Sequence, residues 1–428
     1  MSKRSNRSDQ SAHKTCVSPR LTLVILIAFL LMCLLLVSAC ASDNALDERT
    51  TQEENASVPS EPILDPQQWL EEYPDQVRSF MTATESAPEH DYLEHYPWLA
   101  TIYEGSGFAK SYFSPRPHLN ALEDVKATLR INEKSPSSCF SCKTPQYTIA
   151  ELKDADALYS MTFYEVSDQM TQTITCYDCH KNEPGRGQVG RSGFRGGFLG
   201  STRRHFNEQF TDIDQGTASC GQCHNEYYFD PDTKAVKLPG SLTDPKDIFE
   251  FYQSIDFVDY ENTLTGTQHL KAQHPEFQSY TNSVHDVRGL SCADCHLERV
   301  NGRGGQFTNH RITDPVDSPI IRRSVCLPCH GDEGSLELVE RTQARTKEQT
   351  EAIAIRLAAF TERFGAAVSA GSLAEAQLEE LRALNREAQW YWDWVIVDNG
   401  YGVHNPTQAK ECLDRADELL AQAEALLP

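Results

Sequence analysis

The sequence is poor in apolar residues and has too few basic residues to balance its acidic ones. Hydrophobic residues make up 39% of the 428 positions, below the usual share of a globular protein. Side chains alone therefore supply little material for a large core, and bulky apolar groups of another kind are expected to complete it. Lys and Arg number 39 against 62 Asp and Glu, for a formal net charge of −23. Proteins that bind nucleic acid cluster Lys and Arg to neutralise phosphates, so this balance argues against such a partner.

The first forty residues are typical of a targeting segment. An apolar run over residues 21–39 follows five basic residues, which are Lys3, Arg4, Arg7, Lys14 and Arg20. Basic residues stay on the cytoplasmic side, so we expect the rest of the chain to be exported to the periplasmic side of the membrane. The run ends in LVSAC at residues 36–40, which resembles a bacterial lipobox with Cys40 as the lipidated residue. An uncleaved anchor helix is the alternative, because the run is just long enough to span a bilayer.

Ten of the fourteen cysteines form five pairs with the spacing C-x-x-C. The pairs are Cys139/Cys142, Cys176/Cys179, Cys220/Cys223, Cys292/Cys295 and Cys326/Cys329. Four pairs are followed at once by a histidine, and the first is followed by a lysine; these residues are His180, His224, His296, His330 and Lys143. Of the other four cysteines, Cys16, Cys33 and Cys40 lie in the targeting segment, and Cys412 has no evident role.

The sequence C-x-x-C-H is the attachment motif of c-type haem. Two thioethers hold the haem, and the histidine is its proximal iron ligand. Zinc knuckles also use C-x-x-C pairs but need no histidine after each one, and disulfides, which suit an exported protein, leave the histidines unexplained. Within this series the Lys143 motif indicates a fifth haem with lysine as its proximal ligand. That ligand is unusual, and it marks the first haem as different in function from the other four.

Nine further histidines are candidates for the distal iron position. An electron-transfer haem usually has both axial positions filled, whereas a catalytic haem keeps one open. Four bis-histidine haems would need four of the nine, which are His90, His95, His118, His205, His269, His274, His285, His310 and His404. The residues alone do not choose among them, although a surface or core role suits His90, His95, His205 and His269 best.

The chain resembles the pentahaem, ammonia-forming cytochrome c nitrite reductases. One lysine motif followed by four histidine motifs is that family's order. Further matches lie at residues 114–118 (SPRPH), 124–130 (DVKATLR), 220–229 (CGQCHNEYYF) and 271–276 (KAQHPE). The resemblance covers roughly residue 65 to the C-terminus, and together these motifs are highly specific.

The resemblance implies an active site on the open side of the Lys143 haem. Nitrite would bind there through its nitrogen, with Arg130, Tyr227 and His274 lining the distal pocket. This is consistent with the chemistry, because a guanidinium suits an anion and the reduction to ammonium consumes six electrons and eight protons. Histidine and tyrosine can serve as proton donors.

The resemblance also implies the remaining ligands and one calcium ion. The distal histidines would be His310 for the second haem, His118 for the third, His404 for the fourth and His285 for the fifth. Calcium would be held by four oxygen donors, namely the Glu226 carboxylate, the backbone carbonyls of Tyr227 and Lys271, and the Gln273 side chain. The family forms homodimers through long C-terminal helices, and a membrane quinol-oxidising cytochrome or another periplasmic protein would donate electrons.

The expected fold is mainly α, with a loop-rich multihaem body, long C-terminal helices and little β structure. We divide the chain into residues 1–40 (signal or anchor), 41–63 (flexible acidic tether), 64–335 (pentahaem catalytic body) and 336–428 (helical region that dimerises and supplies one haem ligand). In the last region, Gly371 and Ser372 predict a helix break with an N-cap. A final helix is expected over about residues 407–426.

A stretch rich in Gly and Arg over residues 181–204 allows two interpretations. It contains Arg186, Arg191, Arg195, Arg203 and Arg204. These arginines form either a solvated loop that pairs with haem propionates or a positive path that draws nitrite toward the pocket.

Three alternative functions fit parts of the sequence. A pure electron conduit would have all haems six-coordinate and leaves the lysine motif unexplained. The same pocket would also suit hydroxylamine or sulfite, and only the resemblance favours nitrite. A haem-carrying binding protein would need neither an open site nor proton donors.

Overall fold

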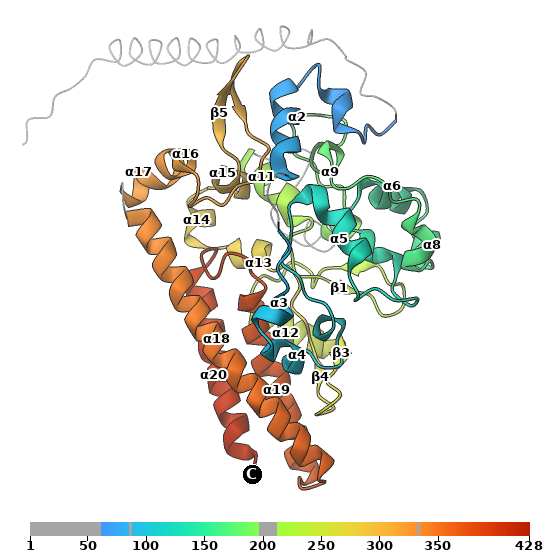
Figure 1. Ribbon diagram of the computed structural model, residues 1–428, viewed down its shortest axis with the longest axis vertical. Coiled ribbons are helices and arrows are strands. Elements are labelled where there is room, and N and C mark those ends of the chain that lie inside the picture. The colour runs from blue at the N-terminus through green and yellow to red at the C-terminus, as the bar shows by residue number, and fades with distance from the viewer. Residues whose placement is uncertain (1–60, 85–87, 197–211, 332–333) are drawn as a thin grey trace, which may run out of the picture. The chain divides into compact units, whose positions relative to one another are not determined.

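The computed structural model describes residues 61–84, 88–196, 212–331 and 334–428. Contacts divide the chain after Val58, and the residues from Pro59 onward form one compact unit, part of which is drawn in colour in Figure 1. The predicted targeting segment, most of the tether, Arg203, Arg204 and His205 lie outside the described residues. Within these described ranges, no helix is long and apolar enough to cross a membrane.

The part of the unit that carries the five motifs consists of short helices joined by loops. Several helices start with a capping side chain followed by proline, as where Thr144 precedes Pro145 and Asp244 precedes Pro245. The helices are α2 (Pro74–Met81), α3 (Tyr92–His95), α4 (Trp98–Ile102), α5 (Ala121–Ala127), α6 (Pro145–Lys153), α7 (Ala155–Tyr159), α8 (Phe163–Ser167), α9 (Cys176–His180), α10 (Ser192–Phe194), α11 (Asp212–Gly221), α12 (Pro245–Ser254), α13 (Glu276–Tyr280), α14 (Val284–Val287), α15 (Cys292–His296), α16 (Pro319–Ile321) and α17 (Leu327–His330).

Strands in the described residues are confined to three short antiparallel hairpins. They are β1 (Tyr228–Phe229) with β2 (Val236–Lys237), β3 (Tyr260–Glu261) with β4 (Gln268–His269), and β5 (Arg299–Gly302) with β6 (Gly305–Thr308). In the longest hairpin, Arg299 is opposite Thr308, and Gly305 has a φ of 121°, which glycine adopts without strain. The predicted fold class, mainly helical and loop-rich with little β structure, is confirmed.

Three long helices form the C-terminal region and run side by side (Figure 1). They are α18 (Gly334–Ser369), α19 (Glu375–Ile396) and α20 (Pro406–Leu426). The break between α18 and α19 lies where it was predicted, and Gly371 takes a positive φ of 62° there. The predicted N-cap is wrong: the N-cap of α19 is Ala374, and the Ser372 hydroxyl instead donates to the Ala367 carbonyl at the end of α18.

The C-terminal half of α19 is buried on all sides and anchors the region to its neighbours. Trp390, Trp392 and Trp394 are each at most 1% exposed. Their indole N–H groups donate to the Pro245 carbonyl at the start of α12, the Thr350 carbonyl in α18 and the Gln408 side chain in α20. A helix buried all round belongs to the core rather than to a surface layer.

Asp393, in the same buried half of α19, contacts the segment with the predicted calcium donors and pocket residues. The Asp393 carboxylate accepts from the Lys271 ammonium at 3.0 Å, the Ala272 amide at 2.9 Å and the Tyr103 hydroxyl at 2.5 Å. The Lys271 and Asp393 side chains are 3% and 0% exposed. The long C-terminal helices therefore help to hold the backbone that precedes His274.

We predict that Asp393→Asn destabilises the protein strongly, because it leaves the buried Lys271 ammonium without its anion. Breaking one side of a buried pair costs about 3–5 kcal/mol. Thermal unfolding followed by circular dichroism should show a clear drop in the midpoint. In the control Asp414→Asn, which breaks the exposed pair with Lys410, the midpoint should hardly move. Equal midpoints for the two variants would contradict this role of Asp393.

Candidate active site

One continuous cavity of about 2430 Å³ runs through the body of the unit. It is lined by the ten motif cysteines, Lys143 and the four motif histidines. An ordinary small-molecule pocket has about 300–1,000 Å³, so this cavity offers room for several large groups. The motif cysteines do not pair into disulfides, and the described residues form no disulfide. Thiols that line an apolar cavity beside histidines fit covalently attached haem, and the disulfide interpretation is not supported.

Local capping explains how a motif brings its cysteines and histidine onto one helical turn. In α9, Asp178 lies between the two cysteines, and its carboxylate accepts from the Thr175 amide at 2.8 Å. In α15, Asp294 does the same with the Ser291 amide at 2.8 Å. Each motif aspartate thus closes a capping box that starts its own helix.

The structure places the four predicted distal histidines opposite the four motif histidines. Ring centroids lie 6.0 Å apart for His180 and His310, 6.1 Å for His224 and His118, 6.4 Å for His296 and His404, and 6.2 Å for His330 and His285. An imidazole nitrogen binds a transition metal at about 2 Å, so two rings on opposite sides of one ion should have centroids about 6 Å apart. Each pair therefore leaves space for one iron.

The other described histidines do not compete for these positions. His90 and His95 are exposed, and His269 is buried with its ring stacked on Tyr260. None of the three lines the cavity. The core or surface role expected for them agrees with where they lie.

Hydrogen bonds at Nδ1 orient several of the paired rings. Nδ1 faces the Arg186 carbonyl in His180, the Thr308 carbonyl in His310, the Thr313 carbonyl in His296 and the Asp398 carboxylate in His404, at 3.0, 2.8, 3.1 and 2.6 Å. When Nδ1 carries the proton and donates it, Nε2 keeps the lone pair that binds a metal. The rings are therefore set to present Nε2 to an iron between them.

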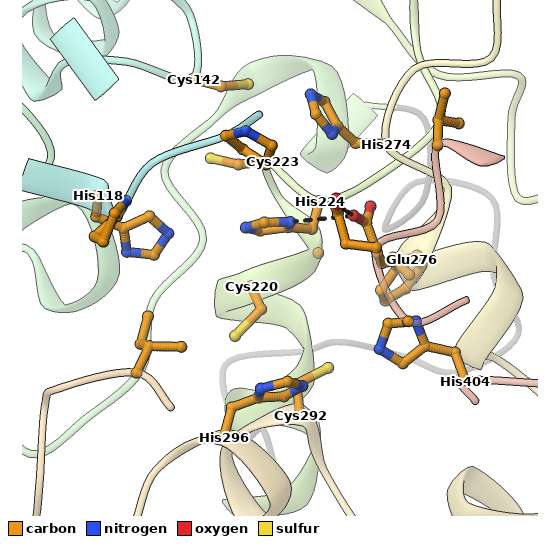
Figure 2. A pocket seen from close by; sticks show the side chains of 18 of the residues that line it. His118, Cys142, Cys220, Cys223, His224, His274, Glu276, Cys292, His296 and His404 are labelled. Carbon is orange, nitrogen blue, oxygen red and sulfur yellow. Dashed lines mark hydrogen bonds and ion pairs between the residues drawn. The ribbon is translucent and has the colours of Figure 1, made fainter. Parts of the chain in front are cut away.

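His224 has two histidine neighbours, and Glu276 distinguishes them. The His274 ring is 6.2 Å from the His224 ring, close to the 6.1 Å of His118. Nδ1 of His224 lies 3.9 Å from Oε1 of Glu276, and Figure 2 shows His118 on the side of His224 away from that carboxylate. Nε2 of His224 therefore faces His118, and His274 is left for another role.

Contacts between cysteines place the motifs, numbered in chain order, in a spatial sequence. The Cys142 side chain lies next to that of Cys223, and the Cys292 side chain lies next to that of Cys220, which joins motif 1 to motif 3 and motif 3 to motif 4. Cys295 and Cys326 lie close enough to interact electrostatically, which joins motif 4 to motif 5. Cys179 and Cys220 also lie close enough to interact electrostatically, which joins motif 2 to motif 3.

The three predicted pocket residues line the cavity on the side of the Lys143 motif. Arg130 and Tyr227 interact electrostatically with each other and with Cys139, and His274 interacts with Lys143. Burial lowers the pKa of His274 to about 4, with the Glu276 carboxylate opposing the shift. Burial raises the pKa of Tyr227 above its usual range. At neutral pH the pocket therefore holds a protonated phenol and a neutral imidazole, whose buried Nδ1 has no hydrogen-bond partner among the described residues.

Arg130 is a cation without a carboxylate partner among the described residues. Its guanidinium donates to the Ser111 carbonyl at 3.0 Å and stacks over the Phe108 ring at 4.5 Å. Burial lowers its pKa, although an arginine stays charged under all ordinary conditions. A half-buried cation with spare N–H donors is suited to bind a small anion.

Three of the four predicted calcium donors, those of Glu226, Lys271 and Gln273, also lie together. The Glu226 carboxylate accepts from the backbone amide of Gln273 at 2.7 Å, and the side-chain amide of Gln273 donates to the Lys271 carbonyl at 2.9 Å. No cluster of three or more His, Cys, Asp or Glu side chains suited to a metal occurs in the described part of the chain, so a cation here needs carbonyl oxygens as well.

The charge around these donors favours a cation. Burial raises the pKa of Glu226 and raises that of the neighbouring Asp259 to about 7. Lys271 is already paired with Asp393, and neither Glu226 nor Asp259 forms an ion pair with a described residue. Asp259 was not predicted from the sequence, and only its position beside Lys271 reveals it.

The structure decides part of the question about the Gly- and Arg-rich stretch. Arg191 is 3% exposed and donates to Asp178 at 2.7 Å and to Thr148 at 2.9 Å. Its backbone amide also donates to Gln222, between the cysteines of motif 3. Arg191 therefore ties motifs 2 and 3 together and does not guide anions in from solvent. Arg186 and Arg195 are exposed.

Known proteins resemble this chain in sequence and in fold. A sequence profile of the cytochrome c552 family matches residues 65–428. A cytochrome c-552 of Maridesulfovibrio salexigens is 30% identical over 422 aligned residues, which cover 94% of this chain and 82% of that protein. A solved cytochrome c nitrite reductase from Desulfovibrio desulfuricans, a catalytic subunit described with two calcium sites, superimposes with a TM-score of 0.75 at 25% identity, over 85% of this chain and 86% of that one. This chain is thus a multihaem c-type cytochrome and belongs to the cytochrome c552 family.

Proposed function

We propose that this protein reduces nitrite to ammonium at the haem of the Lys143 motif. One nitrite, eight protons and six electrons give one ammonium and two waters. The observation that carries the proposal is the pocket beside Lys143, where the half-buried Arg130 guanidinium has no carboxylate partner among the described residues and lines the same cavity as Tyr227 and His274. The four histidine pairs account for the other motifs and leave this one for chemistry.

When bound at the Lys143 motif, a haem would supply redox-active iron for nitrite, and the other haems would supply the electrons. Arg130 holds the anion and stabilises charge that develops on its oxygens. His274 is neutral when the pocket is empty, because burial lowers its pKa to about 4. An anion beside the ring favours the imidazolium, so the ring takes up a proton as the substrate binds and can pass it on. Tyr227 stays protonated and donates a hydrogen bond.

The measured product decides between this proposal and its alternatives. Protein carrying five haems is supplied with reduced viologen and nitrite, and ammonium formed is compared with nitrite and viologen consumed. We expect one ammonium per nitrite and six viologen electrons. No consumption of nitrite would favour an electron conduit. A kcat/KM for hydroxylamine or sulfite far above that for nitrite would change the proposed substrate.

We further propose that the Glu226, Tyr227, Lys271 and Gln273 oxygens hold one calcium ion. Chelation should then lower the unfolding midpoint, because a ligand at a hundred times its dissociation constant contributes about 2.7 kcal/mol. Calcium should restore the midpoint and magnesium should not, since magnesium demands a tighter octahedron. The Glu226→Gln variant should be insensitive to the chelator. Protein that contains no calcium by elemental analysis and unfolds identically with and without chelator would contradict the site.

We propose a periplasmic location, with lipidation at Cys40 as the first choice for the tether, and a homodimer formed through the C-terminal helices. A membrane quinol-oxidising cytochrome or another periplasmic protein would supply the electrons. The exposed Ile355 on α18 supports a helix face that meets a second copy. Sedimentation of the haem-loaded protein tests the dimer, and mass spectrometry of the N-terminus tests lipidation.

A further inference from the structure

The Nδ1 acceptors of the paired histidines differ in charge from one haem to the next. Both rings of motif 2 face neutral backbone carbonyls. His285 and His330, the pair of motif 5, have no side-chain hydrogen bond to any described residue. In contrast, carboxylates face His404, the partner of motif 4, and His224 of motif 3. The two motifs with carboxylates are also direct neighbours through Cys220 and Cys292.

The contact between Asp398 and His404 is built into the loop between α19 and α20. Oδ1 of Asp398 lies 2.6 Å from Nδ1 of His404, and the carboxylate is anchored by the Gly400 amide at 3.0 Å. A Cβ on Gly400 would lie 2.7 Å from the same ring nitrogen, so glycine is needed for the close approach. Asp398 is 3% exposed, and water therefore screens the contact little.

Glu276 makes a longer contact with His224 in the centre of Figure 2. Nδ1 of His224 and Oε1 of Glu276 are 3.9 Å apart, and the same oxygen accepts from the side-chain amide of Asn399 at 2.5 Å. Asn399 follows Asp398 directly, so one short loop positions both carboxylates. The other oxygen of Glu276 is buried and has no partner among the described residues.

From this pattern we propose that Asp398 and Glu276 are positioning residues that hold the fourth and third haems at lower reduction potentials than neutral acceptors would. The Asp398 carboxylate lies within hydrogen-bond distance of Nδ1 of His404 and so raises the basicity of that ligand, and greater electron donation stabilises ferric iron. The Glu276 carboxylate, 3.9 Å from Nδ1 of His224, acts in the same direction through its negative charge. The two haems that lie between the pocket and motif 5 would then hold strongly reducing electrons. The inference rests on the proposed ligand pairs but not on nitrite as the substrate.

The test is a redox titration of the haem-loaded protein without substrate, in which optical and electron paramagnetic resonance spectra report the oxidation state of each haem. Asp398→Asn should raise the potential of the fourth haem, so that its reduced-to-oxidised ratio at fixed potential grows by about tenfold or more, or about 59 mV for one electron. Glu276→Gln should raise the potential of the third haem by less, because its contact is longer. Glu151→Gln is the matched control, since Glu151 is buried and accepts from Tyr159 but touches no ligand histidine. Shifts in the first two variants no larger than in the control would overturn the inference.

The unaltered protein gives a second test if a variant fails to take up its haems. The two bis-histidine haems reduced last should be magnetically coupled, because motifs 3 and 4 lie side by side. Last-reduced haems without mutual coupling would overturn the inference. A protein without four low-spin haems would overturn the ligand pairs and the inference with them, whereas normal potentials without nitrite turnover would contradict only the proposed substrate.

Discussion

Replacing Arg130 by alanine should reduce kcat/KM for nitrite by about 100- to 1,000-fold, the usual cost of removing a donor that stabilises charge in the transition state. Arg130 has no carboxylate to neutralise it among the described residues, and its guanidinium is fixed by the Ser111 carbonyl and the Phe108 ring. The loss should therefore come from the missing anion contact. Steady-state rates with reduced viologen, measured over a range of nitrite concentrations, give kcat/KM for the variant and the wild type.

Two further variants separate charge from position. Arg130→Lys keeps a cation but loses the planar fork, so it should recover only part of the rate. Arg415→Ala removes an exposed ion pair with Glu387 on the C-terminal helices and should leave the rate unchanged. If Arg130→Ala kept wild-type kinetics with a full set of haems, nitrite would have to bind elsewhere.

Replacing Lys143 by alanine should abolish nitrite reduction, with a loss of at least about a hundredfold. Lys143 follows the first C-x-x-C pair, and its backbone amide donates to the Phe140 carbonyl at 2.9 Å, so the side chain starts from a fixed point on the cavity wall. Without the proximal amine, the iron above the pocket lacks the ligand that sets its position and electron density. Activity is measured together with the haem content of the variant.

The other haems report whether this effect is local. The four low-spin haems should keep their spectra in Lys143→Ala, because their ligands come from other motifs. Lys143→His restores a nitrogen ligand and should keep more activity than alanine. An alanine variant with five haems and full activity would show that the chemistry takes place at another haem.

Fold class and cofactor could be predicted from the sequence because both depend on local patterns. The C-x-x-C-H spacing is a chemical requirement for attachment, and long runs rich in Ala, Leu and Glu favour helix whatever surrounds them. The helix break at Gly371 could be predicted as well, because glycine disfavours helix. The N-cap at Ser372 was mispredicted, since a hydroxyl there can bond to the preceding helix as well as to the next one.

Residues that act through tertiary contacts could not be predicted from local sequence patterns. The four distal histidines came from resemblance, and only the folded chain brings His310 beside His180 or His404 beside His296. Asp398 and Asp259 carry no local signal, because an aspartate in a loop is most often solvated. Arg191 was assigned to a surface stretch by composition, yet it is buried.

The electron paramagnetic resonance spectrum of the oxidised protein, recorded before and after nitrite is added, shows whether the Lys143 motif carries the haem that binds nitrite. We expect one high-spin haem, at this motif, that becomes low-spin when nitrite binds, while four bis-histidine haems stay low-spin throughout. Five low-spin haems before nitrite is added, with no change afterwards, would contradict nitrite binding at this motif and would make the protein an electron conduit.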